Sequence, residues 1–336
     1  MSFRTGLAEP LLLGRVTLRN RVFVAPMSGI TDMPFRRRAH AAGAGMVVSE
    51  MVASGELTKG RQGSLQRIRP AGLDVHVVQL AGREAQPLAE AARIAAGEGA
   101  DIIDINMGCP AKKVTGGYAG SALMRDIDHA VTLIAAVVGA VAVPVTVKMR
   151  LGWDETALNA PMLARRAEQA GVRMITVHGR TRCQFYTGQA DWRAIRRVKE
   201  AVTIPVVANG DISSQADAQR ALAMSGADAV MVGRAGCGAP WVAGAIASAV
   251  GPGAPMKPDD IAAYVVEHYE EMLSFYGVAS GLRQARKHLG WYLDGQAPDI
   301  PANVRAAILR ADDPQTVVDL LRRALDHAGQ MQRSAA

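Results

Sequence analysis

Three cysteines occur in the 336-residue chain, and one of them, Cys109, stands in a setting that suits chemistry. It lies in a Gly-Cys-Pro turn directly after an apolar run, and Lys112 and Lys113 follow it closely. Nearby cations favour the thiolate and make such a group a usable acid or nucleophile. A lone cysteine is more often a small buried apolar side chain, and we favour that interpretation for Cys183 and Cys237.

Lys148 ends another apolar run, where an ammonium group without a partner is costly. We expect it to meet an anion or a polarised carbonyl, and the N1–C2=O edge of a flavin is one such group. An ion pair with Glu50 is the alternative. Gln79 also ends an apolar run, where it can hydrogen-bond the pyrimidine edge of a flavin or simply close the end of a strand.

Two further apolar runs end in glycine-containing sequences, Asn209-Gly210-Asp211 and Gly233-Arg234. In (β/α)8 barrels the loops after the last two strands often bind a phosphate through backbone N–H groups. Arg234 would add charge-assisted hydrogen bonds to such a phosphate. Two tight turns without a ligand are the alternative. His178, at the end of the preceding run, can bind the same phosphate or orient a substrate.

Several other kinds of chemistry lack the residues they require. No pair among the histidines has the spacing of metal ligands, so we expect no metal site. The odd number of cysteines and the lack of a C-x-x-C pair exclude a disulfide scaffold. The sequence also contains neither a Walker loop nor a G-x-S-x-G nucleophile elbow.

Polar residues at the ends of apolar runs require a repeating scaffold that brings those ends together. Strand-like runs are predicted at Val22–Pro26, Met46–Ser49, Val75–Leu80, Ile102–Asn106, Pro144–Met149, Met174–His178, Pro205–Asn209 and Ala229–Gly233. Between them lie helix-like segments, including Glu84–Ala96, Asp126–Val138, Ala157–Ala170, Asp191–Val202 and Ser214–Met224. Eight such units predict an α/β fold of the (β/α)8 TIM-barrel type, whose catalytic residues come from the strand ends. A doubly wound sheet is the alternative.

After the last predicted strand the chain no longer alternates between strands and helices. Gly251–Pro255 is typical of a linker, and four helices are predicted beyond it, at Pro258–Phe275, Leu282–Leu293, Ala302–Arg310 and Pro314–His327. We therefore expect a C-terminal all-helical domain over residues 251–336, after a barrel domain over residues 1–250.

The chain carries a formal charge of +7, which favours a polyanionic partner. The tail has nine Lys and Arg against eleven Asp and Glu, so the positive excess lies in the barrel. Basic clusters there are Arg36–Arg38 and the set Lys59, Arg61, Arg67 and Arg69. The uncharged stretch Ala130–Val147 is interrupted by glycine and proline, so we expect a buried helix and strand, no membrane span and a cytoplasmic protein.

Taken together, these strand ends and their flanks resemble the tRNA-dihydrouridine synthases, most of all the B-type bacterial branch. The stretches that carry the resemblance are Ala25–Arg36, Asp104–Val114, Val145–Arg150, Val177–Arg182, Tyr186–Trp192, Pro205–Asp211, Gly226–Arg234 and, in the tail, Arg286–Tyr292. They extend over nearly the whole chain, and the cysteine turn with its two lysines is the most specific of them. Ser28, where many members have alanine, and Thr115–Tyr118 depart from the common pattern.

The resemblance implies a monomeric, FMN-dependent enzyme that uses NADPH to reduce the C5=C6 bond of uridines in tRNA. It implies that the flavin delivers hydride to C6 and that Cys109 protonates C5. The implied FMN-binding residues are Pro26, Met27, Ser28, Gln79, Lys148, His178, Asn209, Gly210, Asp211, Gly233 and Arg234. The implied substrate-binding residues are Asn106, Arg38, Arg180, Arg182, Arg286, Lys287 and His288.

Two other functions fit parts of the pattern. An FMN barrel that reduces a small pyrimidine or another small molecule would explain the strand ends but not the basic clusters or the helical tail. A non-catalytic RNA-binding protein on a barrel scaffold would not need both Cys109 and Lys148.

Overall fold

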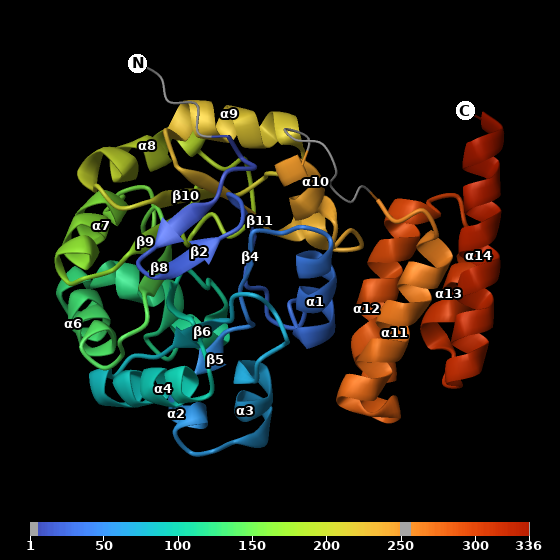
Figure 1. Cartoon of the computed structure of the whole chain (residues 1–336), viewed down its shortest axis with the longest axis horizontal. Helices are drawn as coiled ribbons and strands as arrows, with labels where there is room; N and C mark the ends of the chain where they lie inside the picture. The colour runs from blue at the N-terminus through green and yellow to red at the C-terminus, as the bar shows by residue number, and fades with distance from the viewer. Residues whose placement is uncertain (1–5, 249–256, 336) are drawn as a thin grey trace.

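The computed structural model of the protein describes residues 6–248 and 257–335. Its main sheet has nine strands paired in parallel in the order β4-β3-β11-β10-β9-β8-β7-β6-β5. The strands are β3 (Val22–Val24), β4 (Met46–Val47), β5 (Val52–Ala53), β6 (Val77–Ala81), β7 (Ile102–Met107), β8 (Val145–Arg150), β9 (Met174–His178), β10 (Val206–Asn209) and β11 (Ala229–Val232). They lie inside a ring of helices (Figure 1).

The sheet closes into a barrel because β4 and β5 are two halves of one barrel strand. Val48, just after β4, forms a parallel bridge with Val77 of β6, and β5 pairs with the other end of β6. The strand breaks at Ser49–Met51, where the Ser49 hydroxyl accepts a hydrogen bond from the backbone N–H of Gln79 at 3.0 Å. The predicted (β/α)8 barrel is therefore confirmed, with eight positions around the sheet.

A hairpin closes the amino-terminal end of the barrel. Strands β1 (Leu11–Leu13) and β2 (Val16–Leu18) pair antiparallel, and the sequence analysis did not predict them. Their buried leucines and valine form one apolar cluster with strand residues such as Phe23, Met174 and Val207. The alternate apolar residues of the strands, such as Ile103, Val147 and Ile175, pack outward against the helices.

The outer helices are α1 (Met33–Ala41), α2 (Ser54–Leu57), α3 (Gln62–Ile68), α4 (Ala85–Gly97), α5 (Lys112–Thr115), α6 (Ile127–Val138), α7 (Ala160–Gln169), α8 (Trp192–Ala201), α9 (Gln215–Ser225) and α10 (Val242–Ser248). Bounds were predicted from the sequence for α4, α6, α7, α8 and α9, and each of these begins and ends within three residues of them. Asp126, Asp191 and Ser214 each accept a hydrogen bond from the backbone N–H three residues on, which fixes where α6, α8 and α9 start.

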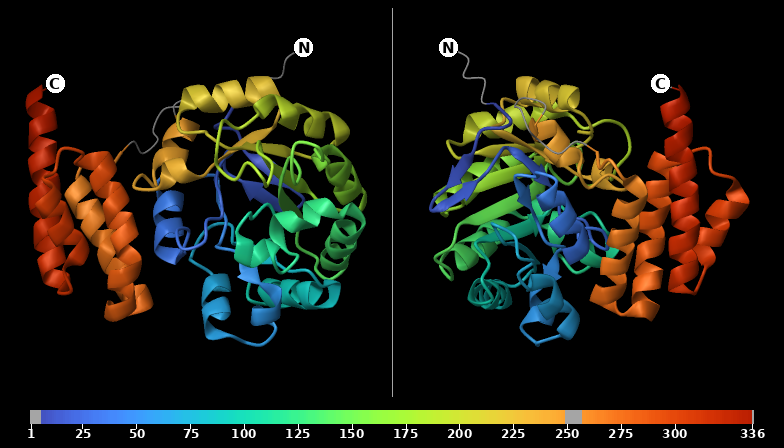
Figure 2. Two further views of the ribbon diagram at one scale, coloured as in Figure 1. Left: turned by 180° about the vertical axis from the view of Figure 1, so that it is seen from behind. Right: turned by 45° about the vertical axis from the view of Figure 1, so that its right-hand side comes forward.

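Four helices form the C-terminal region: α11 (Ile261–Tyr276), α12 (Val278–Gln296), α13 (Ala302–Arg310) and α14 (Pro314–Ala335). They enclose a separate apolar core that includes Tyr269, Leu289 and Leu321. Figure 2 shows them standing beside the barrel, next to α1 and α10. The predicted linker at Gly251–Pro255 and the predicted boundary between residues 250 and 251 lie outside the described residues.

Arg38 lies where α1 packs against α11. Its side chain is only 7% exposed, forms an ion pair with Glu271 at 3.2 Å and stacks on Tyr264 with its guanidinium carbon 4.7 Å from the ring centroid. The resemblance implied an RNA contact for this residue. In the structure its guanidinium therefore contacts residues at the junction between the two parts of the protein.

Asp32 links the same two parts from the start of α1. One carboxylate oxygen accepts the N–H of Phe35 at 3.0 Å, and the other accepts the hydroxyl of Tyr276 in α11 at 3.0 Å. Burial raises the pKa of Asp32 to about 6, against the opposing effect of these hydrogen bonds. The native state therefore holds this proton more tightly than the unfolded chain does.

We expect Asp32→Asn to remove a pH dependence of stability. A raised carboxyl pKa stabilises the native state fully below pH of about 4, and that contribution is lost as pH rises through about 6. A difference of about two pKa units corresponds to about 3 kcal/mol, so the variant should gain up to that amount relative to wild type between pH 4 and 7. Urea unfolding at both pH values measures it. Asp126→Asn, at the exposed cap of α6, should show no such change, and an Asp32→Asn difference that is equal at both pH values would contradict the prediction.

Candidate functional site

The carboxyl ends of the barrel strands surround a cavity of about 500 Å³, which we call the strand-end pocket. Its lining residues come from the loops after β3, β10 and β11 and from the ends of β8 and β9. They are Ala25, Pro26, Met27, Lys148, His178, Tyr186, Asn209, Gly210, Asp211, Ile212, Ser213, Gly233, Arg234 and Ala235. Most of the residues predicted to bind FMN therefore meet at one place, although they are spread over more than 200 positions of sequence.

Lys148 is a half-buried cation that lines this pocket. Its Nζ donates to Asn209 Oδ1 at 3.0 Å, and Asn209 in turn donates to the carbonyl of Met231 at 2.8 Å. Burial lowers the pKa of Lys148 to about 8, and the charge of Arg150 acts in the same direction. The alternative ion pair with Glu50 is not formed, because that carboxylate accepts the N–H of Gly29 at 2.5 Å and faces Arg67.

Asp211 gathers the arginines at the other end of the strand-end pocket. Arg180 binds its carboxylate through two nitrogens, at 3.0 and 2.6 Å, and Arg234 lies 3.2 Å from it. Although burial favours the neutral acid, hydrogen bonds from Arg180 and Ala190 hold the pKa of Asp211 below its usual value. A carboxylate repels a phosphate, so the contribution of Asp211 to an anion site is to hold the arginines. The resemblance assigned Arg180 to RNA, but it is only 1% exposed and points into this cluster.

Gly210 must be glycine at this position. Its φ is +113°, and a Cβ there would lie 2.7 Å from Ala190 Cβ and 2.8 Å from His178 Cδ2. Burial, together with the positive charges of Lys148 and Arg150, lowers the pKa of His178 well below its usual value. The imidazole is therefore neutral at pH 7, and its Nε2 lies 3.4 Å from an Arg180 nitrogen.

Tyr186 lines the strand-end pocket although sequence reasoning did not select it as a site residue. Its ring is exposed, and the guanidinium carbons of Arg150 and Arg234 lie 5.5 and 4.9 Å from the ring centroid. The sequence feature that could have identified Tyr186 is an aromatic residue in a polar loop after a predicted strand. Such a ring, held by two cations, offers a flat surface at the mouth of the pocket.

Cys109 sits on a turn that is fixed from several sides. The side-chain oxygen of Asn106 accepts the N–H groups of Gly108 and Cys109 at 3.2 and 3.0 Å. The carbonyl of Cys109 accepts the Ser121 hydroxyl at 2.8 Å, and Arg150 donates to the carbonyl of Gly108 at 2.8 Å. The thiol is half-buried and close enough to Lys148 and Arg150 to interact with their charges.

Gln79 and Asn106 are engaged within the protein. Gln79 donates to Asp104 at 2.7 Å and accepts from Asn106 at 2.7 Å, and neither amide lines the strand-end pocket. The resemblance implied that Gln79 binds FMN and that Asn106 binds substrate. In the structure both amides hydrogen-bond to other residues of the protein. Both amides instead support the cysteine turn from below.

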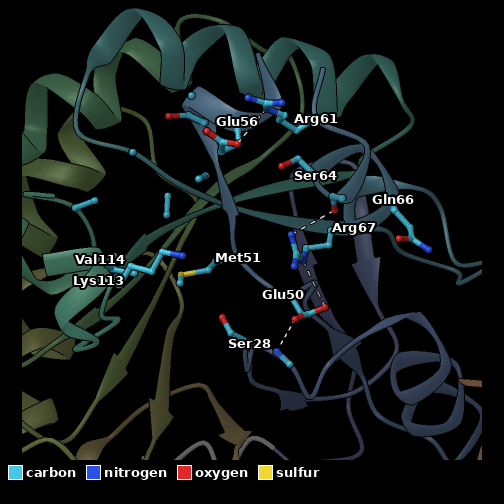
Figure 3. Close-up of a pocket in the computed structure, with 18 of the residues that line it drawn as sticks. Ser28, Glu50, Met51, Glu56, Arg61, Ser64, Gln66, Arg67, Lys113 and Val114 are labelled. Atoms are coloured by element: carbon cyan, nitrogen blue, oxygen red, sulfur yellow. Dashed lines mark hydrogen bonds and ion pairs between the residues drawn. The ribbon is translucent and has the colours of Figure 1, made fainter. Parts of the chain in front are cut away.

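A second, larger cavity of about 960 Å³ lies between the barrel and the helical region, and we call it the interdomain pocket. Ser28, Glu50 and Met51 face Lys113 and Val114 across it, and Arg61 and Arg67 come from the segment around α2 and α3 (Figure 3). Phe275, Tyr276 and Gln284 of the helical region also line it. Ser28 therefore belongs to this pocket, next to Met27 of the strand-end pocket.

The sequence of this chain was also compared with those of known proteins. A sequence model described as "Dihydrouridine synthase (Dus)" matches residues 23–329. The chain belongs to the dihydrouridine synthase family. Dihydrouridine synthases are oxidoreductases, so the chain is an enzyme of that class, and the family-specific cysteine turn lies beside the strand-end pocket described above.

Relatives across this family resemble the chain over nearly its full length. "Probable tRNA-dihydrouridine synthase" of Rhizobium leguminosarum bv. phaseoli is 57% identical over 96% of this chain and 100% of its own. The same description is given to a Rhodobacter capsulatus protein that is 59% identical over 90% of this chain and 94% of its own. "tRNA-dihydrouridine synthase B" of Xanthomonas campestris pv. campestris is 47% identical over 94% and 95%. The predicted resemblance to the B-type branch is confirmed.

Solved structures support the barrel fold of this dihydrouridine synthase. An old yellow enzyme homologue from Zymomonas mobilis is similar with a TM-score of 0.52 and 17% identity, covering 70% of this chain and 90% of its own. Morphinone reductase is similar with a TM-score of 0.54 and 16% identity, covering 77% and 93%. At such identities the likeness establishes the fold alone.

The remaining residues that the family resemblance assigned to tRNA lie in three different settings. Arg182 stacks on Trp153, with 4.7 Å between its guanidinium carbon and the ring centroid. Lys287 donates to Gln284 at 2.9 Å and approaches Gly29, whereas Arg286 pairs with Asp312 at 3.0 Å. His288 is 2% exposed, and burial lowers its pKa to about 3, so it is an interior residue rather than an RNA contact.

No cluster of three or more His, Cys, Asp or Glu side chains able to hold a metal ion occurs in residues 6–248 and 257–335. None of the helices in those ranges combines the length and the apolar character needed to cross a membrane.

Proposed function

We propose that this dihydrouridine synthase binds FMN in the strand-end pocket and uses NADPH to reduce the C5=C6 bond of uridines in tRNA. The observation that carries the proposal is a half-buried Lys148 in an arginine-rich pocket, beside a half-buried thiol on a fixed turn. This arrangement offers a cation for the electron-rich edge of a flavin and a proton donor within the same barrel mouth.

The residues of the strand-end pocket fit FMN from end to end. Its volume of about 500 Å³ falls in the usual range for pockets that bind cofactors. Arg234 and the glycine backbones at Gly210 and Gly233 would hold the phosphate, with Asp211 and Arg180 keeping Arg234 in place. Pro26 and Met27 would contact the ring, and Lys148 would bind its N1–C2=O edge. The neutral His178 would add a hydrogen bond near the ribityl chain.

When bound, FMN supplies the hydride that is added to C6 of uracil, after taking it from NADPH. The Cys109 thiol would hold the proton that is delivered to C5, so the added hydride and proton together complete the reduction of the double bond. Lys148 and Arg150 are both cations within electrostatic reach of the sulfur. A fixed backbone at Cys109 keeps the thiol oriented during this transfer.

A tRNA base reaches such a site only after leaving its stack. The interdomain pocket provides room for it next to Met27 and Ser28, and the basic side chains of Lys59, Arg61 and Lys113 line its walls. We propose that the helical region over residues 251–336 contacts the tRNA, with Lys287 as its nearest basic side chain to the barrel loop at Gly29.

The test combines an absorbance spectrum of the purified protein with NADPH oxidation in the presence of unmodified tRNA. A flavin spectrum and reoxidation that requires tRNA would support the proposal. A flavin that is reoxidised equally well without tRNA would contradict the substrate, and a protein that takes up no FMN would contradict the cofactor.

The acidic residues of the interdomain pocket favour a second candidate, an FMN-dependent reductase of a small pyrimidine. Glu50, Glu56 and Glu84 line this pocket together with the basic residues and weaken its attraction for phosphates. Salt separates the two functions, because contacts with RNA phosphates weaken steeply as salt rises, whereas turnover of a neutral small molecule does not.

We expect FMN affinity to fall by about tenfold between pH 7 and 9. With a pKa of about 8, Lys148 is mostly charged at pH 7 and mostly neutral at pH 9, so the ammonium that binds the flavin edge is lost. Lys148→Met should bind FMN more weakly at pH 7 and show no change up to pH 9. Fluorescence titration of the apoprotein measures both. Lys113→Met, which removes an exposed lysine outside the strand-end pocket, should keep the wild-type pH profile, and a flat wild-type profile would contradict the role of Lys148.

A further inference from the structure

Beneath the two pockets, a line of hydrogen bonds runs from a buried carboxylate to the cysteine turn. Thr146 donates to one oxygen of Asp104 at 2.6 Å, and Gln79 donates to the other at 2.7 Å. Asn106 donates to Gln79 at 2.7 Å and accepts the N–H of Cys109 at 3.0 Å. The residues come from β6, β7 and β8, three neighbouring strands of the barrel.

Asp104 determines which way the two amides in this line face. Its carboxylate can only accept, so Gln79 must turn its NH2 group toward it. The oxygen of Gln79 then faces Asn106 and requires an NH2 group there. The oxygen of Asn106 is thereby left to face the N–H groups of Gly108 and Cys109. A reversal of either amide would bring two acceptors within 2.7 Å of each other.

We infer that Asp104 is a positioning residue for Cys109, which acts by fixing the orientations of Gln79 and Asn106 in turn. The inference rests on the proposed function for the role of the thiol, but not for the hydrogen-bond line itself. The Asp104 side chain bonds to Thr146 and Gln79 and not to the cysteine turn, so its effect must travel through both amides. Burial raises the pKa of Asp104, while the hydrogen bonds from Thr146 and Gln79 and the charge of Lys148 favour its ionised form.

A second route from Asp104 to the thiol runs through charge, because Asp104 also interacts with Lys148. The two routes differ in what Asp104→Asn does. Asparagine keeps an oxygen for Gln79, and the Thr146 hydroxyl can turn to accept its NH2 group, so the line of hydrogen bonds survives without the charge. If the charge were the route, Asp104→Asn alone would disturb Cys109.

The test exchanges amide and carboxylate groups in two pairs of residues, Gln79 with Asp104 and Asn106 with Asp104. Gln79→Glu places a carboxylate against Asp104 and breaks the line, whereas Asp104→Asn with Gln79→Glu restores a donor–acceptor pair. Asn106→Asp faces the oxygen of Gln79 with another oxygen, and Gln79 cannot turn because Asp104 holds it. In the double variant Asp104→Asn with Asn106→Asp, the amide of Gln79 is free to reverse, which restores the line of hydrogen bonds. The two substituted side chains are connected through Gln79, so a rescue would show coupling across that residue.

Alkylation of Cys109 by iodoacetamide reports the outcome without tRNA or NADPH. It is measured across pH 6 to 9 in a background with Cys183→Ser and Cys237→Ser, at equal FMN occupancy. Gln79→Glu and Asn106→Asp should each raise the rate about tenfold, because repulsion between two acceptor oxygens displaces the side chains that hold the turn and makes the half-buried thiol accessible. Asp104→Asn and both double variants should stay within about threefold of the parent.

Double variants that alkylate as fast as the single ones would overturn the inference, and so would an Asp104→Asn variant that alkylates tenfold faster. The two pairs share Asp104→Asn but differ in the second substitution, so if either Gln79→Glu or Asn106→Asp fails to fold the other pair still decides. If Asp104 only supported the fold, its substitution would not rescue a change at Asn106. A failure of tRNA-dependent turnover with the expected alkylation pattern would instead contradict the proposed function and leave the positioning role intact.

Discussion

Replacing Cys109 with alanine is expected to lower the rate of uridine reduction by about 100-fold to 10,000-fold, the range typical for loss of a positioned general acid. Alanine removes the thiol but keeps the backbone N–H and C=O through which Asn106 and Ser121 hold the turn. FMN affinity should therefore stay within about twofold of the wild-type value. The measurement is a single turnover of NADPH-reduced enzyme mixed with excess unmodified tRNA.

Cys183→Ala is the matched control, because this thiol is exposed and lies outside the strand-end pocket. Its single-turnover rate should equal that of the wild type. NADPH should reduce the bound flavin at the wild-type rate in both variants. A slow reaction with tRNA then reports on proton transfer to uridine and not on flavin reduction. A Cys109→Ala enzyme that reduces uridine at the wild-type rate would remove the thiol from the mechanism.

Arg180→Met is expected to destabilise the protein by about 3 kcal/mol and to abolish FMN binding at micromolar concentrations. The buried guanidinium holds both oxygens of Asp211 and donates to the carbonyls of Thr187 and Gly188 at 3.0 and 2.6 Å. Without it, the partly exposed carboxylate of Asp211 and two carbonyl groups lose hydrogen bonds from a buried charged donor, and the sum of these losses destabilises the native state. Urea unfolding and FMN titration measure the two effects.

Arg234→Met separates the ligand site from the fold. Arg234 also pairs with Asp211, but its side chain is 58% exposed, and exposed ion pairs contribute about 0–1 kcal/mol. We expect nearly wild-type stability for this variant, with FMN affinity lowered about tenfold through loss of a phosphate contact. Equal loss of stability in both variants, or unchanged FMN affinity in both, would contradict the roles assigned here.

The barrel strands were predictable because each is a local apolar run that ends in polar or glycine residues. The hairpin of β1 and β2 was not predictable in this way, since each strand has only three residues and its alternating pattern is too short to distinguish. The break between β4 and β5 was missed for another reason. It depends on the Ser49 hydroxyl replacing a backbone partner of Gln79, which is 30 positions away.

The same contrast holds for the candidate site. The position of Lys148, Asn209 and Gly210 around one pocket follows from the rule that strand ends of a parallel barrel share one face. The surroundings of Arg38, Arg180 and His288 could not be read locally, because their burial is produced by segments far away in sequence. A basic residue next to a functional motif looks like an RNA contact until the packing around it is known.

The hairpin at the foot of the barrel has a kinetic consequence. In the described part of the chain its apolar side chains fill that end, and the residues that line the strand-end pocket lie at the opposite, carboxyl ends of the strands. In the proposed reaction, a nicotinamide and a uracil must both approach the flavin from these carboxyl ends. The oxidised nicotinamide therefore has to leave before the RNA base can enter, so the two ligands bind one after the other in each catalytic cycle.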